Sequence, residues 1–454
     1  MEKSLFEKLI LDPRYKTAKK ELLQLLSEYQ KQLTCPRKAN PGLEAGYQQL
    51  LRKAASLRGT PLFHPYLGSG LGNGLLVELA DGSVKYDLIC GIGVHYFGHS
   101  FPELISYALD ASLENTIMQG NLQQNVDSIE LLEHLTKYSK FDHAFLTTSG
   151  AMANENALKI IFQKKHPAFR LIAFEGCFMG RTCVMSQLTD KPAFREGLPA
   201  NIFIDYIPFY NPNDPKKSTE ETLAVLKKHL KRHPQEYAAL CLELVQGENG
   251  FYAGTKEFFL EIIKVAKEAN LAILVDEVQT FARTYELFAF QHFGLQEVAD
   301  VVTVGKVLQC GATLWKDAYN PKPGLLSQTF TASSSSIWAA KFLLPYIMEQ
   351  NYFGENGKIA ALFSRFSERL SALKGIVKGP FGLGSMIAFT PFDGSPQKVN
   401  QFIHKLFDNG VISFVAGTDP TRVRFLLPVG IMDEKDVDPI MDIVEKTLNE
   451  MKTL

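Results

Sequence analysis

From about residue 127 onward, short apolar segments alternate with longer amphipathic segments, and this alternation constrains the fold more than any other feature of the chain. The apolar segments lie at 143–150, 170–176, 238–246, 271–278 and 300–308. Segments with helical spacing separate them, so the pattern predicts a mostly parallel sheet covered by helices on both faces. We therefore expect an α/β fold with a large, doubly wound domain whose functional loops follow the carboxyl ends of the strands. Within it, Ser218 and Glu221 have the spacing of a capping box and predict a helix that begins there.

The chain on either side of this region has a different character. Residues 1 to about 60 carry apolar side chains at helical spacing, and the region after about residue 336 mixes helical segments with short strands. We therefore expect three parts: residues 1–74 as a helical arm and hairpin lead-in, 75–335 as the large α/β domain, and 336–454 as a smaller α+β C-terminal domain.

A run of glycines before residue 75 has the look of a nucleotide-binding loop, but its context excludes that reading. A dinucleotide fingerprint needs a buried strand before the glycines and a helix after them. Here a strand over Leu75–Leu79 is followed by the turn Asp81-Gly82 and a second strand over Val84–Ile89, which predicts a β-hairpin.

Net charge and cysteine usage narrow the class of protein. The chain has 48 Lys+Arg and 49 Asp+Glu, a net charge of -1, so no overall field favours nucleic acid or an anionic membrane as a partner. Its six cysteines form no CxxC pair and no His/Cys cluster at metal-ligand spacing, so we expect reduced thiols, no metal site and a cytoplasmic protein. The sequence starts with no apolar leader and has no apolar run of about 18 residues, so we expect neither secretion nor membrane spanning.

Two residues at predicted strand ends suggest chemistry. Lys306 is the only cation between Asp300 and Lys316 and stands among apolar residues. Most lysines are surface charges, but a desolvated lysine amine has a lowered pKa and can form a Schiff base. Asp276 ends the apolar strand 271–275, where an acid faces the ligand crevice of an open sheet or serves only as a loop carboxylate. A lysine that forms an imine and an acid that protonates a pyridine nitrogen are the groups that pyridoxal phosphate chemistry requires.

A third segment offers a place for a phosphate. Ser149-Gly150-Ala151 stand where a predicted strand turns into a helix, so backbone N–H groups and the positive end of the helix dipole converge there. A Walker phosphate loop is excluded, because neither Gly305-Lys306 nor Gly357-Lys358 is followed by Ser or Thr.

These residues stand in motifs that resemble those of a known family. The segments "CFMGRT", "ELVQGENG", "ILVDEVQT" and "TVGK" occur in the order and at about the spacing seen in the class III, ω-amino-acid type, pyridoxal-phosphate-dependent aminotransferases. The resemblance covers roughly residues 72 to 450. It implies the fold-type I architecture, pyridoxal 5'-phosphate as cofactor, and a homodimer with shared active sites.

The resemblance also implies a role for individual residues of the cofactor site. Lys306 forms the internal aldimine and moves the proton, Asp276 keeps the pyridine nitrogen protonated, and Gln279 hydrogen-bonds the ring hydroxyl. Phe178 stacks on one ring face and Val278 packs on the other, although Phe178 also fits a plain core position. The phosphate is bound by the backbone N–H groups of Gly150 and Ala151, and by Thr329 of the neighbouring subunit.

For the substrate, the resemblance is to the subgroup acting on γ-aminobutyrate, ornithine and lysine. Arg181 corresponds to the residue that binds a distal carboxylate, and Arg424 to the residue that binds the α-carboxylate. Glu248 matches the glutamate that neutralises that second arginine when an ω-amine is bound. Read alone, each arginine is more often a surface ion pair than a ligand clamp. The expected reaction is amino transfer from an ω-amino donor such as lysine, ornithine or γ-aminobutyrate to a 2-oxo acid, 2-oxoglutarate being the natural candidate.

Some segments depart from the family pattern. Met152 replaces a glutamate in "SGAMAN", "QTFARTYE" is a shortened form of the family's "QTGFGRTG", and "TFTASSSS", which begins at Thr329, stands where the family has "TFGGNP". These departures lie around the substrate entrance and the subunit contact. The segment "GKVLQCG" is more similar to the lysine 6-aminotransferase branch of the family. An aminomutase or decarboxylase on the same scaffold is the alternative, because such enzymes share the cofactor residues. A non-catalytic binding protein is a further rival that Lys306, Asp276 and Gln279 disfavour.

Overall fold

The computed structural model describes residues 2–452, which pack into two compact units. The large unit consists of residues 115–360 and 381–386, and the small unit of residues up to 114, 361–380 and from 387 onward. The sequence places residues 75–114 in the expected large domain, whereas here they group with the small unit, because β3 (Val84–Asp87) pairs with β17 (Val411–Ile412). The domain boundaries themselves stay a prediction.

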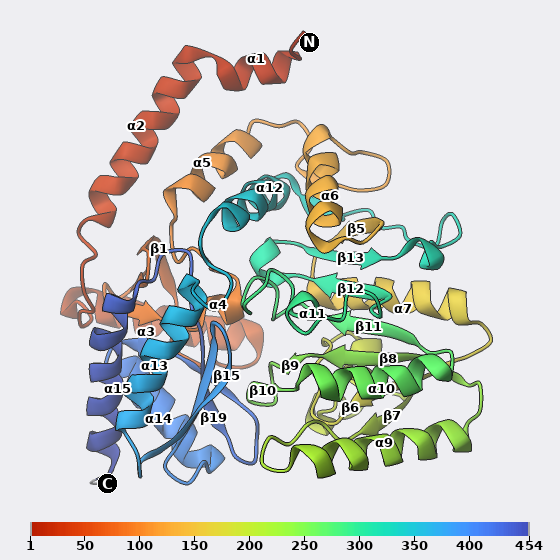
Figure 1. Ribbon diagram of the computed structural model, residues 1–454. Coiled ribbons are helices and arrows are strands. Elements are labelled where there is room, and N and C mark those ends of the chain that lie inside the picture. Colours follow the sequence, from red (N-terminus) through yellow and green to blue (C-terminus); the bar gives the residue numbers. More distant parts are fainter. Residues whose placement is uncertain (1, 453–454) are drawn as a thin grey trace. The chain divides into compact units, whose positions relative to one another are not determined.

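The large unit contains a seven-stranded sheet in the order β5-β13-β12-β11-β8-β6-β7, which Figure 1 shows from top to bottom. Its strands are β5 (His143–Thr147), β6 (Arg170–Phe174), β7 (Phe203–Ile207), β8 (Tyr237–Glu243), β11 (Ala272–Asp276), β12 (Val301–Val304) and β13 (Gly311–Trp315). The neighbours from β12 to β7 are parallel, and β13 is antiparallel to both of its neighbours. The sheet is therefore mostly parallel, as predicted.

Helices accompany the strands in the expected alternation. They are α6 (Val126–Ser139), α7 (Gly150–Lys165), α8 (Cys183–Leu188), α9 (Pro215–Arg232), α10 (Lys256–Glu268), α11 (Ala289–His292) and α12 (Ser334–Glu349). Short 3-10 turns cover Pro192–Phe194, Lys306–Leu308 and Asp317–Tyr319, and two small strand pairs join β9 (Val245–Gln246) to β10 (Tyr252–Ala253) and β4 (Met118–Gln119) to β14 (Ala332–Ser333).

Alternate side chains of the central strands bury opposite faces of the sheet. Leu171 and Ala173 belong to the core cluster that contains Ala157 and Ile161 of α7. Phe174, on the other face, has its ring centroid 5.6 Å from that of Phe258 in α10. Both faces are thus covered by helices, which is why the strands read as continuous apolar runs.

The small unit combines helices with sheet. Its helices are α1 (Leu5–Leu11), α2 (Pro13–Gln30), α3 (Pro41–Arg58), α4 (Cys90–Gly93), α5 (Pro102–Ala111), α13 (Lys358–Ala372, of which the residues from 361 onward belong here), α14 (Pro396–Asp408) and α15 (Val437–Lys452), with a 3-10 turn over Glu434–Asp436. One sheet has the order β1-β2-β3-β17, with β1 (Gly68–Asn73) and β2 (Leu76–Leu79). The other has the order β15-β16-β19-β18, with β15 (Val377–Leu383), β16 (Met386–Pro391), β18 (Phe414–Ala416) and β19 (Arg422–Leu426), although residues 381–383 of β15 and Met386 of β16 are grouped with the large unit. The predicted hairpin is confirmed, because β2 and β3 pair as antiparallel neighbours.

Two local predictions are wrong. The helix expected to begin at Ser218 begins at Pro215, and Asp214 is its N-cap, with Asp214 accepting a hydrogen bond from Lys217 N. The preference of proline for the first turn of a helix explains the earlier start. The strand expected over 300–308 ends at Val304, and Lys306 lies in the 3-10 turn that follows.

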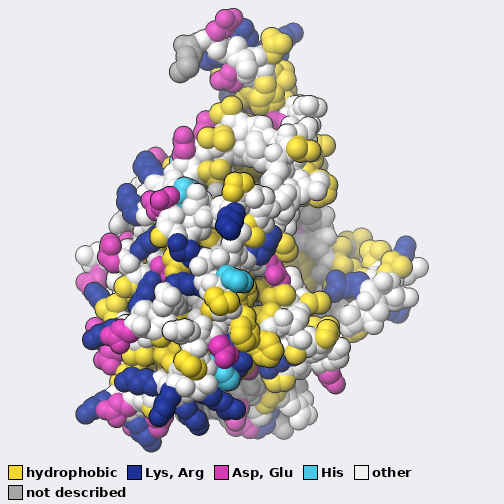
Figure 2. Space-filling view, turned by 90° about the vertical axis from the view of Figure 1, so that its right-hand side faces the viewer, with side chains coloured by type: hydrophobic (Ala, Val, Ile, Leu, Met, Phe, Trp, Pro, Cys, Tyr) yellow, Lys and Arg dark blue, Asp and Glu magenta, His cyan; other side chains and the backbone are white. Residues whose placement is uncertain are grey.

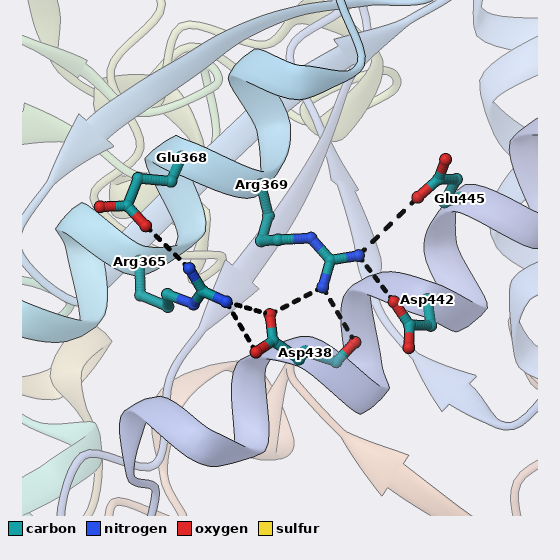
Figure 3. Close-up of polar contacts among 6 residues, drawn as sticks. All are labelled: Arg365, Glu368, Arg369, Asp438, Asp442 and Glu445. Carbon is teal, nitrogen blue, oxygen red and sulfur yellow. Dashed lines mark hydrogen bonds and ion pairs between the residues drawn. The ribbon is translucent and has the colours of Figure 1, made fainter.

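Helices α13 and α15 of the small unit are joined by a network of ion pairs, shown in Figure 3. Asp438 of α15 accepts hydrogen bonds from Arg365 at 2.6 Å and from Arg369 at 2.7 Å, and Arg369 also pairs with Asp442 at 2.7 Å. Charge-assisted contacts between adjacent helices stabilise their packing modestly where they are exposed to solvent.

The surface carries charges of both signs. On the face shown in Figure 2, Lys and Arg side chains are intermixed with Asp and Glu side chains, so that face presents no broad region of one sign. None of the helices within residues 2–452 has the length and apolar composition needed to cross a membrane.

Candidate active site

A cavity of about 270 Å³ lies in the large unit and brings together most of the predicted site residues. Its lining includes Gly150, Ala151, Phe178, Arg181, Glu248, Asp276, Val278, Gln279 and Lys306. Asp276 is the last residue of β11, Gly150 is the first of α7, and Lys306 follows the end of β12. The cavity therefore lies at the carboxyl ends of the strands, where open α/β sheets bind ligands.

Asp276 is buried and held by two hydrogen bonds. Its Oδ2 accepts from Asn154 Nδ2 at 2.7 Å and its Oδ1 from the backbone N–H of Val278 at 2.8 Å. Burial raises the pKa of Asp276 to about 6, although these bonds and the charge of Lys306 act in the opposite direction. A carboxylate with this environment is oriented by the protein and is better stabilised by a cationic ligand than by solvent.

Glu243 is a second buried carboxyl group in the cavity. It ends β8, its Oε2 accepts from Phe178 N at 2.6 Å, and its Oε1 accepts from Gly247 N at 3.1 Å. Burial and then the charge of Asp276 raise the pKa of Glu243 to about 8. Two acids with raised pKa values at the carboxyl ends of neighbouring strands indicate a binding site for a group that carries positive charge.

The backbone around Lys306 approaches two neighbouring elements closely. A Cβ atom on Gly305 would lie 3.3 Å from Val278 Cγ1 and 3.5 Å from Gly150 Cα, and one on Gly150 would lie 2.5 Å from Val278 Cγ1. Lys306 itself has φ of 50°, in the left-handed region that non-glycine residues rarely adopt. Such strain is typical of functional sites, where the surrounding structure holds the backbone in place.

The N-terminus of α7 faces the same cavity. Ser149 is the N-cap, and its Oγ accepts from Met152 N at 3.3 Å, while Gly150 and Ala151 line the cavity. The first N–H groups of a helix have no partner within the helix, so they can bind an anion such as a phosphate.

Gln279 carries an acceptor that the protein does not use. Its Oε1 is buried and has no hydrogen-bond partner among the residues that the structure describes. Gly247 packs tightly against this side chain, since a Cβ atom at position 247 would collide with the same oxygen. An oriented buried acceptor at the cavity wall suits a hydroxyl group of a ligand.

Phe178, Arg181 and Glu248 lie at the outer part of the cavity lining. The Phe178 ring is half-buried, Arg181 is exposed, and the guanidinium carbon of Arg181 lies 3.9 Å from the ring centroid of Phe194. Glu248 is half-buried, and its backbone oxygen accepts a hydrogen bond from Lys191 Nζ at 3.2 Å.

Two predicted residues do not line this cavity. Thr329 is exposed, and its backbone packs against Gly120 so closely that a Cβ atom on Gly120 would collide with the Thr329 carbonyl oxygen. Arg424 belongs to the small unit, where it is buried in β19 with its guanidinium carbon 5.3 Å from the Phe414 ring centroid. The expected pairing of Arg424 with Glu248 stays a prediction.

A comparison with protein families decides the identity of the chain. The model of class III aminotransferases matches residues 68–448. The chain belongs to this family. It is therefore a pyridoxal-phosphate-dependent aminotransferase, as predicted.

Individual class III relatives cover most of the chain. The acetylornithine aminotransferase of Methanocaldococcus jannaschii is 28% identical over 401 residues, which are 84% of this chain and 93% of the relative. A 5-aminovalerate aminotransferase of Pseudomonas aeruginosa is 29% identical over 406 residues, with the same coverage of both chains.

Solved structures confirm the expected fold-type I architecture. A lysine aminotransferase from M. tuberculosis has a TM-score of 0.74 at 22% identity, covering 83% of this chain and 93% of that one. The ornithine aminotransferase of Toxoplasma gondii has a TM-score of 0.76 at 20% identity, covering 92% and 100%.

The residues of this aminotransferase fit the cofactor of its family. The cavity offers a helix N-terminus for a phosphate, a buried carboxylate for a ring nitrogen, and the unused Gln279 acceptor for a ring hydroxyl. The glycines at 150 and 305 keep side chains out of the space beside Val278.

Sequence reasoning missed Asn154. Its Nδ2 donates to Met179 O at 2.8 Å as well as to Asp276, and its Oδ1 accepts from Thr303 Oγ1 at 2.7 Å. Asn154 thus links α7, β11 and β12 and orients Asp276. The available signal was its position four residues after Gly150, on the same face of α7.

Proposed function

We propose that this aminotransferase moves an amino group from an ω-amino donor, such as lysine, ornithine or γ-aminobutyrate, to 2-oxoglutarate. One observation carries the proposal: the cavity that contains Lys306 and buried Asp276 also contains Arg181, whose guanidinium group has no carboxylate partner within residues 2–452. An exposed arginine next to a reaction centre can bind a carboxylate at the far end of a substrate chain through two N–H groups.

The roles of the cofactor-site residues follow from their chemistry. Lys306 would attach the cofactor and move the proton, while Asp276, oriented by Asn154 and Val278, would hold a proton at the ring nitrogen. When bound, pyridoxal phosphate supplies the electron sink for a carbanion at the substrate carbon.

The remaining residues would orient the cofactor. Gln279 would accept from the ring hydroxyl, Val278 and Phe178 would cover the two ring faces, and the N–H groups of Gly150 and Ala151 would bind the phosphate.

The names of the relatives favour a donor with a distant amine. The 5-aminovalerate, lysine and ornithine aminotransferases are named for substrates in which a chain separates a carboxylate from an ω-amine. Such a donor would bring its amine to the cofactor that Lys306 holds and its carboxylate to Arg181, whereas 2-oxoglutarate would bring its distal carboxylate to the same arginine.

We also propose that the enzyme is a cytoplasmic homodimer in which Thr329 reaches the phosphate bound by the partner subunit. Exposed apolar side chains gather in the segments next to Thr329: on both sides of β4, in the first turn of α6 and in the loop before β14. They are Ile117 at 74% exposure, Leu122 at 100%, Val126 at 71%, Ile129 at 52% and Phe330 at 55%. An apolar surface of this kind is typical of a protein interface. Light scattering of the purified enzyme tests the homodimer by its mass. The wild-type protein should have the mass of a dimer, and Leu122→Lys should shift it toward the monomer. A monomeric wild-type protein would contradict the proposal.

A coupled assay tests the reaction. Lysine, ornithine, acetylornithine, 5-aminovalerate and γ-aminobutyrate are offered in turn with 2-oxoglutarate, and glutamate is measured. We expect glutamate to form in equal amount to the donor consumed. Conversion of a donor without consumption of any 2-oxo acid would instead establish the aminomutase alternative.

A further inference from the structure

The ring of Phe194 lies under the guanidinium group of Arg181, at 3.9 Å from ring centroid to guanidinium carbon. Phe194 ends the 3-10 turn Pro192–Phe194 and does not line the cavity itself. We propose that Phe194 is a positioning residue that holds Arg181 ready for the distal carboxylate of the substrate, and so sets the preference for dicarboxylic 2-oxo acids. This inference rests on the proposed role of Arg181.

Stacking on an aromatic face suits this task. A guanidinium group is attracted to the negative face of the ring and loses no N–H donor in doing so. Arg181 has neither an ion pair nor a hydrogen bond from its side chain to another residue in 2–452, so the ring is the contact that limits where its guanidinium group lies. An exposed arginine without such a contact would lose more side-chain freedom when it binds a carboxylate.

Side-chain hydrogen bonds hold the segment that carries Phe194 on both sides of this residue. Arg195 Nη1 donates to Thr189 O at 2.8 Å and to Gln187 O at 3.3 Å. On the other side, Lys191 Nζ donates to the backbone oxygen of Glu248 at 3.2 Å. Phe194 therefore lies on a turn whose position is held by these hydrogen bonds.

The same segment is tied to the residues that precede Arg181. Thr189 Oγ1 accepts from Met179 N at 2.9 Å and donates to Gly180 O at 3.0 Å, and Asp190 Oδ2 accepts from Gly176 N at 2.9 Å. The backbone that carries Arg181 and the ring on which it stacks thus form one hydrogen-bonded piece.

Phe194 also contacts Phe178, the residue proposed to cover one face of the cofactor ring. Their ring centroids are 6.4 Å apart and the rings are nearly perpendicular, at 89°. Edge-to-face contacts of this kind are favourable and directional. The Phe194 ring therefore contacts both Arg181, where the distal carboxylate would bind, and Phe178, which would cover the cofactor. It thus helps to set the length of substrate that fits between these two residues.

The test compares an acceptor with a distal carboxylate, 2-oxoglutarate, with one that lacks it, pyruvate. Phe194→Leu keeps an apolar side chain but removes the aromatic face. We expect its KM for 2-oxoglutarate to rise about threefold to tenfold, the range of a cation–π contact expressed as affinity, with kcat little changed. KM for pyruvate should stay the same, and Phe194→Trp should restore the wild-type value.

A matched control comes from Phe203, an exposed ring on β7 that also stacks on an arginine, Arg170, at 5.3 Å. Phe203→Leu should leave both KM values unchanged, and melting temperatures of the two leucine variants show whether either has lost its fold. Direct binding of glutarate and of butyrate, followed by calorimetry on the holoenzyme, gives a readout without turnover. Only glutarate should bind more weakly to Phe194→Leu.

Arg181→Ala separates this inference from the function on which it rests. If Arg181→Ala leaves the preference for 2-oxoglutarate over pyruvate unchanged, Arg181 is not the carboxylate binder and the proposed substrate role fails. If Arg181→Ala abolishes the preference but Phe194→Leu weakens both acceptors equally, the substrate role stands and the role of Phe194 is wrong. The inference also predicts that adding Phe194→Leu to Arg181→Ala causes no further loss, and a further loss of the same size would overturn it.

Discussion

Asp276 and Glu243 are register partners at the ends of the adjacent parallel strands β11 and β8. Parallel pairing therefore buries two carboxyl groups side by side at the carboxyl ends of these strands, and the charge of Asp276 makes ionisation of Glu243 less favourable. A cationic ring bound there relieves this cost, which links the stability of the protein to occupation of the site.

The first prediction concerns pH and the cofactor-free protein. The pKa of Asp276 is raised to about 6 and that of Glu243 to about 8, so the folded protein keeps protons that the unfolded chain releases above about pH 4. The free energy of unfolding should therefore fall as the pH rises from about 5 to 8. Glu243→Gln should make this slope shallower, as measured by urea midpoints. Glu220→Gln, on exposed α9, is the control, and an unchanged slope in Glu243→Gln would contradict the assignment.

The second prediction concerns Lys306. Lys306→Ala should bind pyridoxal phosphate without a covalent bond and lose nearly all turnover, because Lys306 supplies the lysine amine among the described residues that line the cavity. Borohydride reduction followed by peptide mass spectrometry checks it. Lys316→Ala, in which a surface lysine that bonds Glu297 is removed, should keep the covalent label. A label that stays on the 300–316 peptide of Lys306→Ala would show that Lys306 is not the attachment site.

The third prediction concerns Asp276→Asn. The variant should retain the cofactor but lose about two orders of magnitude or more in turnover, because electrostatic contributions of this kind amount to roughly 3 kcal/mol or more. Asn154→Ala removes a hydrogen bond that orients the carboxylate and should cause a smaller loss of the same kind. Cofactor absorbance and kcat are the measurements, and near-normal turnover in Asp276→Asn would remove this residue from the reaction.

The fourth prediction concerns the proposed switch between Glu248 and Arg424. An ω-amino donor needs an Arg424 that does not attract its carboxylate, whereas the α-carboxylate of a 2-oxo acid needs that arginine free. Arg424→Ala should therefore slow the 2-oxo acid half-reaction more than the donor half-reaction, and Glu248→Ala should favour α-amino donors such as glutamate. Arg181→Ala should weaken both halves if the donor has a distal carboxylate. Single-turnover spectra measure each half-reaction, and equal losses in both for Arg424→Ala would exclude the switch.

The fifth prediction concerns the ion pairs between α13 and α15. Arg365 and Arg369 hold the pKa of Asp438 below its usual range, so this contribution to stability is present at neutral pH and is lost as the pH falls through that lowered pKa. Asp438→Asn should lower the melting temperature at pH 7, and the difference should shrink in high salt and disappear in acid. Asp433→Asn, which removes a longer pair with Lys435, should have a smaller effect. An effect of Asp438→Asn that is independent of salt and pH would indicate a packing defect instead.

The alternation of apolar and amphipathic segments was enough to predict five of the seven strands of the large sheet and the positions of Lys306 and Asp276, but it did not predict β7 or β13. Both kinds of information are local: buried strands read as apolar runs because both sheet faces are covered, and a lone charge at the end of such a run stands out. The motifs that contain Lys306 and Asp276 are continuous in the sequence, so their resemblance to the class III aminotransferases was enough to predict the cofactor.

The residue at which a helix begins was harder to predict, because several residues near the start of a helix can serve as its N-cap. Ser218 has capping-box spacing, but Asp214 followed by Pro215 forms the N-cap one turn earlier. Likewise, the end of β12 at Val304 depends on how Gly305 passes Val278 and Gly150, which lie in distant parts of the chain.

The surroundings of the two reactive groups depend on contacts between segments that are distant in the sequence. Asn154 orients Asp276, Glu243 lies beside it, and Phe194 stacks on Arg181, yet none of these side chains stands out in the sequence. The first contact depends on how α7 packs against the sheet, the second on the register of β11 and β8, and the third on a turn that is hydrogen-bonded to a separate loop. Sequence periodicity shows which face of an element is buried, whereas the partner of a polar group is set by how distant elements pack.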